Sequence, residues 1–450
     1  MKKRIIVAIA LCFLIILIYL SSYPFGCQLK EEIIIIGLDG GSWNIISPLI
    51  KEGKLPNLNK LMKEGVYGEL NSGDRLDAPT IWASIATGGV GLESENTVWR
   101  VLSEHGKIVG ISDWPYASEI NGFMIPAYYE EEKESYPSYM YDFGAKILLK
   151  NPIIEFLRKS YYIKILIPAD RMDKDILYDF YLLDYKSREF FYLRDKFEPD
   201  VSAIVFYGPD RLQQYLWMYT APEKFQNVDE EKIKKYGNVI EEYYKEFDKF
   251  VGRVVNCNKD AIIFIVSGYG FDSSSPPKIV DEILVNNILE SAGFLKFDYR
   301  GEIDFFNTKA YSLNDEMEDV AYVKVKADKN TKIQVKEVFS NIHAEGTNQN
   351  IFTVTETDDG IILRRNAPLQ LGDTNIVITN VVYPIKDFSY RRIISGRRIK
   401  EGVLTVYGKN ISKGKVIYGA TIYDIAPTIS YLFNVSSRGM GGNELSNIFI

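Results

Sequence analysis

The sequence predicts an α/β protein built on a central, mostly parallel sheet flanked by helices, and three observations support this class. Apolar runs short enough to be buried strands alternate with amphipathic segments of helical period. Several of these runs end in glycine-rich or acidic turns, as strands do where an α/β sheet opens onto its ligand crevice. The chain has 450 residues, of which 46% are hydrophobic, so it can bury a large core in more than one folding unit.

The first part of the chain alternates strands and helices in order. Residues 33–41, IIIIGLDGG, are typical of a buried strand that ends in an acidic turn. An amphipathic helix then ends at a glycine, a common helix stop. The elements expected here are a strand over 33–41, helical turns and a helix over 42–65, helices over 78–88 and 97–106, and a strand over 107–112.

Residues 120–196 interrupt this alternation, because they are rich in Tyr, Lys and Leu and mostly helical in period. We expect them to form a helical cap inserted into the α/β core. The alternation then resumes with a strand and a helix over 201–217, a long helix over 230–255 and a strand over 262–271.

A second, smaller subdomain is expected over residues 300–383, where apolar and polar residues alternate as in solvated strands. A strand over 402–408 and a helix over 421–433 then return the chain to the main sheet. The predicted core is therefore residues 31–299 and 384–450, with the cap inside it and the β-rich insertion between its two parts.

Residues 1–30 carry a targeting signal. MKKR is followed by 16 residues without a charge, a length between a signal-peptide core and a full membrane span. We favour an uncleaved membrane anchor over a cleaved signal or a lipid-modified Cys27. The basic cluster places the N-terminus in the cytoplasm, so the main domain is expected outside it, at the cell surface.

The composition excludes some functions. The net charge of −7 gives no electrostatic basis for binding nucleic acid. The chain has only two histidines, His105 and His343, although histidine is the commonest acid–base residue and a frequent zinc ligand. Neither histidine follows a predicted strand of the core, so any chemistry here must use little imidazole.

Several stretches resemble, in the same order, the type I phosphodiesterase / nucleotide pyrophosphatase branch of the alkaline phosphatase superfamily. The resemblance extends from about residue 33 to 445 and rests on IIIIGLDGGSWNIISPLIKEGKLPNLNKLMKEGVYGEL, APTIWASIATG, YGPDRLQQYLW and IYGATIYDIAPTISYLF. It implies two metal ions, usually zinc, at the carboxyl ends of the strands, held by carboxylates and imidazoles. It also implies a Thr or Ser nucleophile that forms a covalent intermediate.

Carried over residue by residue, the resemblance places metal-ligand aspartates at Asp39 and Asp210. The nucleophile position falls on Ala78, which cannot attack phosphorus. Thr80 lies two residues further on, where a helix points its side chain about 200° away. Thr80 is therefore a weak candidate for the nucleophile and is expected to cap or face the helix.

The remaining ligand positions have lost their chemistry. Gln214 stands where the family has a histidine, and Gly268 and Tyr269 stand where it has an Asp–His pair. A fourth position falls on Arg398, which cannot bind a metal because its guanidinium has no lone pair to give. Arg398 either neutralises Asp39 or Asp210 or lies on the surface.

Three functional interpretations follow. The first is a membrane-anchored, catalytically degenerate family member that needs no cofactor and binds an envelope protein, a glycan or a lipid head group. The alternative is an active phosphodiesterase or phosphohydrolase, in which Asp39 and Asp210 hold one divalent metal such as zinc, Mg²⁺ or Mn²⁺, and a bound water or Thr80 attacks. The third is a structural or assembly protein in which the crevice has no role.

Overall fold

The structure is a computed structural model that describes residues 32–73, 76–89, 97–115, 120–127, 171–297, 303–304, 306–312, 316–317, 320–326, 328–347, 349–366 and 375–450. The predicted anchor over residues 1–30 and the middle of the predicted cap, residues 128–170, lie outside this set. Among the described residues, no helix combines the length and the apolar character needed to span a bilayer. The chain divides into two compact units, one formed by the residues up to Ser275 together with Ser395–Ile450, and the other by Pro276–Ile394.

The first unit is built on a sheet of eight described strands in the order β18-β2-β17-β6-β1-β5-β3-β4. Neighbouring strands of this sheet pair in parallel except at β17, which runs antiparallel to both β2 and β6. The α/β class is therefore confirmed. The strands are β1 (Ile33–Leu38), β2 (Val66–Asn71), β3 (Val109–Ser112), β4 (Gly122–Ile125), β5 (Val201–Phe206), β6 (Ile262–Ser267), β17 (Glu401–Tyr407) and β18 (Lys415–Ile417).

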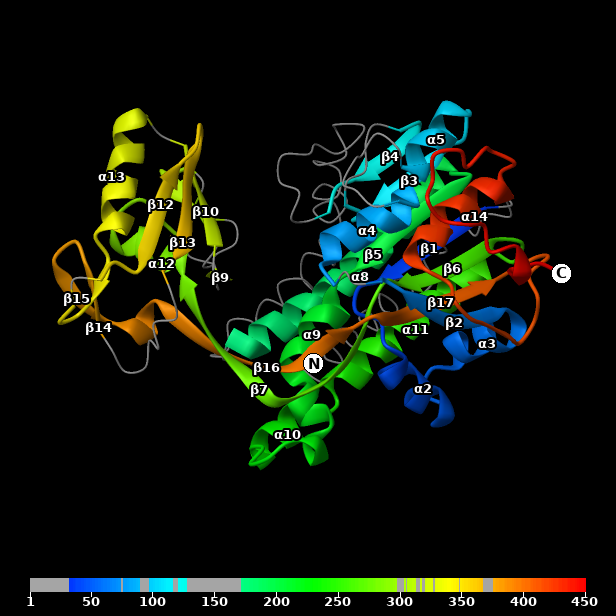
Figure 1. The fold of residues 1–450 in the computed structure, drawn as a ribbon, viewed down its shortest axis with the longest axis horizontal. Coiled ribbons are helices and arrows are strands. Elements are labelled where there is room, and N and C mark those ends of the chain that lie inside the picture. The colour runs from blue at the N-terminus through cyan, green and yellow to red at the C-terminus, as the bar shows by residue number, and fades with distance from the viewer. Residues whose placement is uncertain are drawn as a thin grey trace, which may run out of the picture. The chain divides into compact units, whose positions relative to one another are not determined.

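Helices cover both faces of this sheet (Figure 1). Alternate residues of a strand point to opposite faces, so Ile33 and Ile35 pack into the apolar cluster that also holds α4, α5 and α14. On the other side, α8 contacts β3, β4 and β5, and α11 contacts α8 and α9. The helices of this unit are α2 (Trp43–Lys51), α3 (Pro56–Glu64), α4 (Ala78–Thr87), α5 (Val98–Glu104), α8 (Arg171–Phe197), α9 (Gly208–Thr220), α10 (Glu230–Tyr236), α11 (Val239–Cys257) and α14 (Ile425–Leu432), with single turns η2 (Pro222–Lys224), η4 (Ile422–Asp424) and η5 (Ser446–Ile448).

Two expectations for the core are corrected. The predicted cap begins with β4, which is a strand of the main sheet, and its last part is α8, which packs against that sheet. The single helix expected over 230–255 is two helices, α10 and α11. Gly237 ends α10 with its N–H bonded to the carbonyl of Ile233, and glycine is a common residue at a helix end.

The second unit contains two antiparallel sheets, ordered β12-β13-β10-β8 and β11-β14-β15 in the described residues. Its helix α13 buries Val335 and Phe339 against the first of these sheets, in an apolar core of its own. The elements are β8 (Ala310–Tyr311), β9 (Glu316–Met317), β10 (Val320–Val325), β11 (His343–Ala344), β12 (Phe352–Glu356), β13 (Gly360–Arg365), β14 (Asn375–Ile378), β15 (Val381–Pro384), α12 (Val285–Ser291), α13 (Lys329–Ser340) and η3 (Ile385–Asp387).

This unit is larger than the insertion predicted over residues 300–383, and it includes a 12-residue helix that the strand-like pattern did not reveal. Its bounds extend to Pro276 and Ile394 for two reasons. The long strands β7 (Gly270–Leu284) and β16 (Ser389–Ile399) are neighbours in a further sheet. In addition, α12 contributes apolar side chains to the core of this unit.

Candidate functional site

The topology of the first unit brings four sequence-predicted residues to one edge of the main sheet. Asp39 directly follows β1, Asp210 lies in the first turn of α9 after β5, and Tyr269 follows β6. These strands are parallel, so their carboxyl ends meet at the same edge. Arg398 lies at the same edge because it comes just before β17, and the amino end of this antiparallel strand lies beside the carboxyl end of β6.

Asp210 is the centre of the site. Arg398 donates to both of its oxygens, from Nε to Oδ1 at 2.8 Å and from Nη2 to Oδ2 at 2.9 Å. The Tyr269 hydroxyl donates to Oδ1 at 3.0 Å, and Gln214 Nε2 donates to Oδ2 at 2.6 Å. Each oxygen of this buried carboxylate therefore accepts two hydrogen bonds, and an Arg fork on a carboxylate is among the strongest pairings in proteins.

Of the two placements expected for Arg398, the structure has the one that neutralises an aspartate. Its Nη1 also donates to the carbonyl of Leu76 at 2.8 Å, and its guanidinium lies 4.7 Å from the centre of the Tyr269 ring. The neighbouring Arg397 has 61% of its side chain exposed, against 28% for Arg398. Arg398 is thus fixed by ion-pair, backbone and cation–π contacts together.

Asp39 lies beside this network and is only 3% exposed. Burial and the negative charge of Asp210 raise the pKa of Asp39 to about 7, while Tyr269, Arg398 and Trp82 offset part of that rise. The indole Nε1 of Trp82 donates to Asp39 Oδ1 at 2.7 Å. Near neutral pH, a large fraction of Asp39 is therefore protonated.

Trp82 is a site residue that was not predicted from the sequence. It lies in α4, and its ring packs over Gly37 of β1, where a Cβ would come within 2.7 Å of the indole. The signal in the sequence is a glycine in the middle of an otherwise isoleucine-rich strand. Such a glycine indicates the close approach of another group, but it does not say which group approaches.

The loop after β1 is held in place by a second set of hydrogen bonds. Ser42 donates from Oγ to the carbonyl of Phe271 at 3.0 Å, and its N–H donates to the Tyr244 hydroxyl at 3.1 Å. Gln213 Nε2 donates to the carbonyl of Gly40 at 2.7 Å. These buried contacts fix the backbone that carries Asp39, so the site is rigid on this side.

The helix that carries the predicted nucleophile position begins at Ala78. Asp77 is its N-cap, and Asp77 Oδ1 accepts the backbone N–H of Thr80 at 3.1 Å. Thr80 is therefore not the cap, as one expectation had it, but the residue whose N–H is capped. Among the described residues, the Thr80 hydroxyl takes part in none of the hydrogen bonds of Asp39 or Asp210.

Gly268, which the resemblance places at a metal-ligand position, is closely packed against two isoleucines. A Cβ at this glycine would lie 2.1 Å from Ile81 Cγ2 and 3.2 Å from Ile422 Cγ2. Both isoleucines are fully buried. A carboxylate side chain therefore cannot be accommodated at residue 268 without moving α4.

The residues present do not fit the two metal ions that the resemblance implies. In the described part of the chain, no group of three or more His, Cys, Asp or Glu side chains is arranged to hold a metal. The two oxygens of Asp210 already accept four hydrogen bonds, and Arg398 supplies positive charge at the same place. His105 is exposed at the end of α5, where its Nδ1 lies 2.8 Å from the Val101 carbonyl.

A second polar cluster, not predicted from the sequence, lies at the carboxyl end of β3. Asp113 Oδ2 forms an ion pair with Lys186 Nζ of α8 at 2.9 Å, and Glu189 pairs with the same lysine at 3.1 Å. Burial raises the pKa of Asp113 to about 6 despite Lys186. A small cavity of about 30 Å³ adjoins this cluster and is large enough for one water molecule.

Comparisons with known proteins show the family of the chain. The family model described as type I phosphodiesterase / nucleotide pyrophosphatase matches residues 33–90 and 94–371. A solved structure of human ectonucleotide pyrophosphatase / phosphodiesterase 5 aligns with 93% of this chain and 100% of its own, at 12% identity and a TM-score of 0.43. A structure of the murine protein aligns with 93% of this chain, and a structure of an inactive murine variant in complex with AMP aligns with 94%. Both alignments cover 100% of the murine chain, at 12% identity and a TM-score of 0.43. No curated protein matches the sequence.

Proposed function

The chain belongs to the type I phosphodiesterase / nucleotide pyrophosphatase family, and we propose that it is a catalytically degenerate member that acts by binding rather than by hydrolysis. The observation that carries this proposal is the closed network around Asp210. Its two oxygens accept four hydrogen bonds from Arg398, Tyr269 and Gln214. A divalent metal would have to displace a fixed guanidinium to reach this carboxylate.

The charge balance supports the same conclusion. Arg398 neutralises Asp210, and the pKa of Asp39, raised to about 7 by burial and by Asp210, leaves that carboxyl about half protonated at pH 7 and mostly uncharged below it. Tyr269 is buried, and burial raises its pKa well above the ordinary value, so it is neutral as well. The four groups together carry about half a negative charge at pH 7 and almost none at lower pH, so they offer little attraction to a cation.

The site also lacks the other half of the family's chemistry. Hydrolysis of a phosphodiester through a covalent intermediate needs an activated hydroxyl or thiol nucleophile. Ala78 offers none, and Asp77 holds the backbone of Thr80 as part of the helix cap. An arginine cannot generate a hydroxide nucleophile, as a bound metal does, because its guanidinium holds its protons and offers no lone pair.

The alternative, an active hydrolase with a non-standard site, has one observation in its favour. Asp39 and Asp210 do lie at the same sheet edge, and a carboxyl of pKa about 7 suits a general base. This function would require the Arg398–Asp210 pair to open. We rank it second, because that pair is also held by the carbonyl of Leu76 and the ring of Tyr269.

We further propose that residues 1–30 anchor the protein in a membrane and that the main domain lies outside the cytoplasm. The support is the apolar run after MKKR and its basic flank. In that place the partners to consider are an envelope protein, a glycan or a lipid head group.

The test is the metal content and the turnover of the full-length protein, purified in detergent. Zinc, manganese and magnesium are measured by elemental analysis, and turnover is measured with p-nitrophenyl phosphodiesters and phosphomonoesters in the presence of each metal. We expect no stoichiometric metal and no metal-dependent turnover. The matched variants are Asp39→Asn and, as the control, Asp272→Asn, which changes a partly exposed aspartate outside the network. Near-stoichiometric metal and turnover, both lost in Asp39→Asn and kept in Asp272→Asn, would replace this proposal with the hydrolase.

A further inference from the structure

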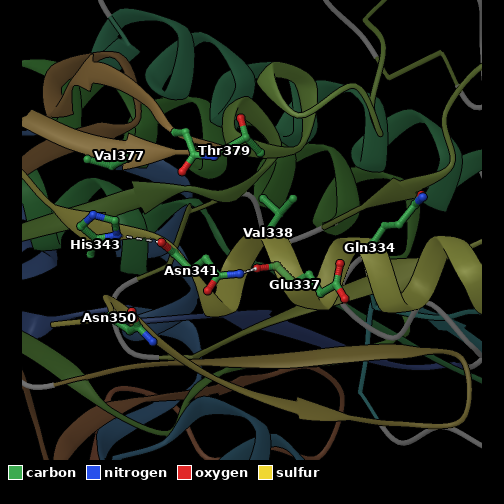
Figure 2. Close-up of a pocket in the computed structure, with 9 residues that line it drawn as sticks. Gln334, Glu337, Val338, Asn341, His343, Asn350, Val377 and Thr379 are labelled. Carbon is green, nitrogen blue, oxygen red and sulfur yellow. Dashed lines mark hydrogen bonds between the residues drawn. The ribbon is translucent and has the colours of Figure 1, made fainter. Parts of the chain in front are cut away.

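The second unit contains a pocket of about 600 Å³ between α13 and the β14–β15 hairpin (Figure 2). This volume lies in the range of sites that hold small molecules. All of its described lining residues belong to this unit, and none of them takes part in the network around Asp210. Nothing in the proposed function uses it.

One wall of the pocket is a stripe on α13. Gln334, Glu337 and Val338 share one face of the helix, and Asn341, the C-cap residue that follows it, continues the same i, i+3, i+4, i+7 spacing. The helix cannot turn this face away, because Val335 and Phe339 are buried in the core of the unit. The stripe is therefore a fixed, mostly polar surface, with Val338 as its apolar member.

The other wall comes from the three-stranded sheet. His343 of β11 pairs with Val377 of β14 and forms a bridge to Asn350, so the three lie side by side. The hairpin turn adds Thr379 and Asn380, whose φ angles are 49° and 66°. A β-branched residue such as threonine rarely adopts a positive φ, which makes Thr379 an unusual residue for this turn.

The hydrogen-bonding groups of the pocket are available to a ligand. His343 Nδ1 lies 2.8 Å from the carbonyl oxygen of Asn341, and a carbonyl can only accept, so Nδ1 carries the proton. In the neutral ring, Nε2 is then an acceptor. Asn341 uses Nδ2 to bond the carbonyl of Glu337, which leaves its Oδ1 as a second acceptor. Among the described residues, the side chains of Gln334 and Asn350 make no hydrogen bond to protein.

The chemistry of the walls selects the class of ligand. Of the described residues, four carboxamides, a hydroxyl, an imidazole and a carboxylate line the pocket, and none of these lining residues is Lys or Arg. Phosphate and carboxylate ligands are normally held by Arg or Lys, and Glu337 would repel them. A carboxamide offers a donor and an acceptor on one planar group, which suits adjacent hydroxyls.

We propose that this pocket binds a neutral saccharide. The carboxamides and Glu337 would bond the hydroxyls of the sugar, while Val338 and Val377 contact its C–H face. Saccharide binding in this pocket goes beyond the proposed function and does not depend on it. The pocket could bind a saccharide whether the site at Asp210 is hydrolytic or degenerate.

The experiment is saturation-transfer NMR on the full-length protein with glucose, galactose, mannose and N-acetylglucosamine at millimolar concentration, and with glucose 6-phosphate as the anionic probe. We expect transfer to at least one neutral sugar and weaker binding of the phosphorylated one. In the double variant Gln334→Ala/Asn350→Ala, the Kd of that sugar should rise about 25-fold, because each of the two lost hydrogen bonds is worth about fivefold.

Two further variants keep the test decisive. Val338→Trp fills the pocket without removing a polar group and should abolish the transfer. Asn330→Ala changes an exposed carboxamide near the start of the same helix, outside the pocket, and should leave the Kd unchanged. The proposal is wrong if no neutral sugar receives transfer, if both pocket variants bind as the parent does, or if glucose 6-phosphate binds more tightly than glucose.

Discussion

The raised pKa of Asp39 makes the stability of the first unit depend on pH, and Asp39→Asn should remove that dependence. Asn has the same shape as Asp, and its Oδ1 can accept the indole N–H that Trp82 donates to Asp39 Oδ1 at 2.7 Å. The amide cannot ionise. The variant therefore resembles the protonated form of Asp39 at every pH.

The magnitude follows from the pKa of about 7 in the folded protein against an ordinary value of 3.8. Each pKa unit corresponds to about 1.4 kcal/mol, so the folded state is destabilised by up to about 4 kcal/mol when Asp39 ionises. The folded state binds this proton more tightly than the unfolded state, so stability falls as pH rises from about 4 to about 7. Of this loss, about 3 kcal/mol lies between pH 5 and pH 8.

The assay is urea unfolding of the full-length parent and variant at pH 5 and pH 8, followed by tryptophan fluorescence. All five tryptophans lie in the first unit, so the signal reports the unfolding of that unit alone. Burial raises the pKa of Asp113 to about 6, so this residue contributes a similar pH dependence of the free energy of unfolding to both proteins. The difference between the two proteins cancels that contribution and isolates Asp39.

The expected result is that the free energy of unfolding of Asp39→Asn, relative to that of the parent, rises between pH 5 and pH 8 by about 3 kcal/mol at most. At pH 8 the variant should be the more stable protein. If it is less stable than the parent by the same amount at both pH values, Asp39 is ionised throughout and the reasoning is refuted. An ionised Asp39 would also remove the charge argument against a bound cation.

Three further predictions concern the same site, and each is measured by the same unfolding assay. Arg398→Ala leaves the carboxylate of Asp210 buried without its partner and should lower the free energy of unfolding by about 3 kcal/mol. Arg398→Lys loses the two-pronged hydrogen bond but keeps the charge, so it should lower it by less. Equal stability of Arg398→Ala and the parent would show that the pair contributes nothing. Gly268→Ala forces a Cβ to within 2.1 Å of Ile81 Cγ2 and should cost about 1–3 kcal/mol, and an unchanged midpoint would mean that α4 moves freely. Trp82→Phe removes a buried donor and should cost about 1–3 kcal/mol, with the larger cost at pH 8, where the carboxyl it serves is ionised; a cost independent of pH would contradict this.

The fold and the position of the site could be predicted from the sequence because both depend on local patterns. An apolar run that ends in an acidic turn predicts a parallel strand with a functional carboxyl end, and the structure places Asp39 and Asp210 at one such edge. The resemblance that these motifs support is confirmed by the family model. The division of the helix over 230–255 at Gly237 also has a local signal, but a glycine in a helical pattern is often tolerated.

The rest could not be predicted because it depends on contacts between distant segments. Nothing around Trp82 in the sequence shows that its indole reaches Asp39, 43 residues away. The sequence left two placements for Arg398 open, and only the antiparallel course of β17 decides between them. The helix α13 was hidden by alternation on both sides of it.

The packing around Gly268 bears on whether the family's chemistry could be restored by substitution. A metal site that had lost only its ligands would keep empty space where those side chains were. Here Ile81 fills the space beside Gly268, and Arg398 supplies the positive charge beside Asp210. Trp82 donates a hydrogen bond to one oxygen of Asp39. Two of these contacts come from α4 and the third from β16, so a single substitution toward a metal ligand meets a clash or an unpaired charge. This packing supports the proposal that the site is a repacked structural core rather than a metal centre that lacks its metal.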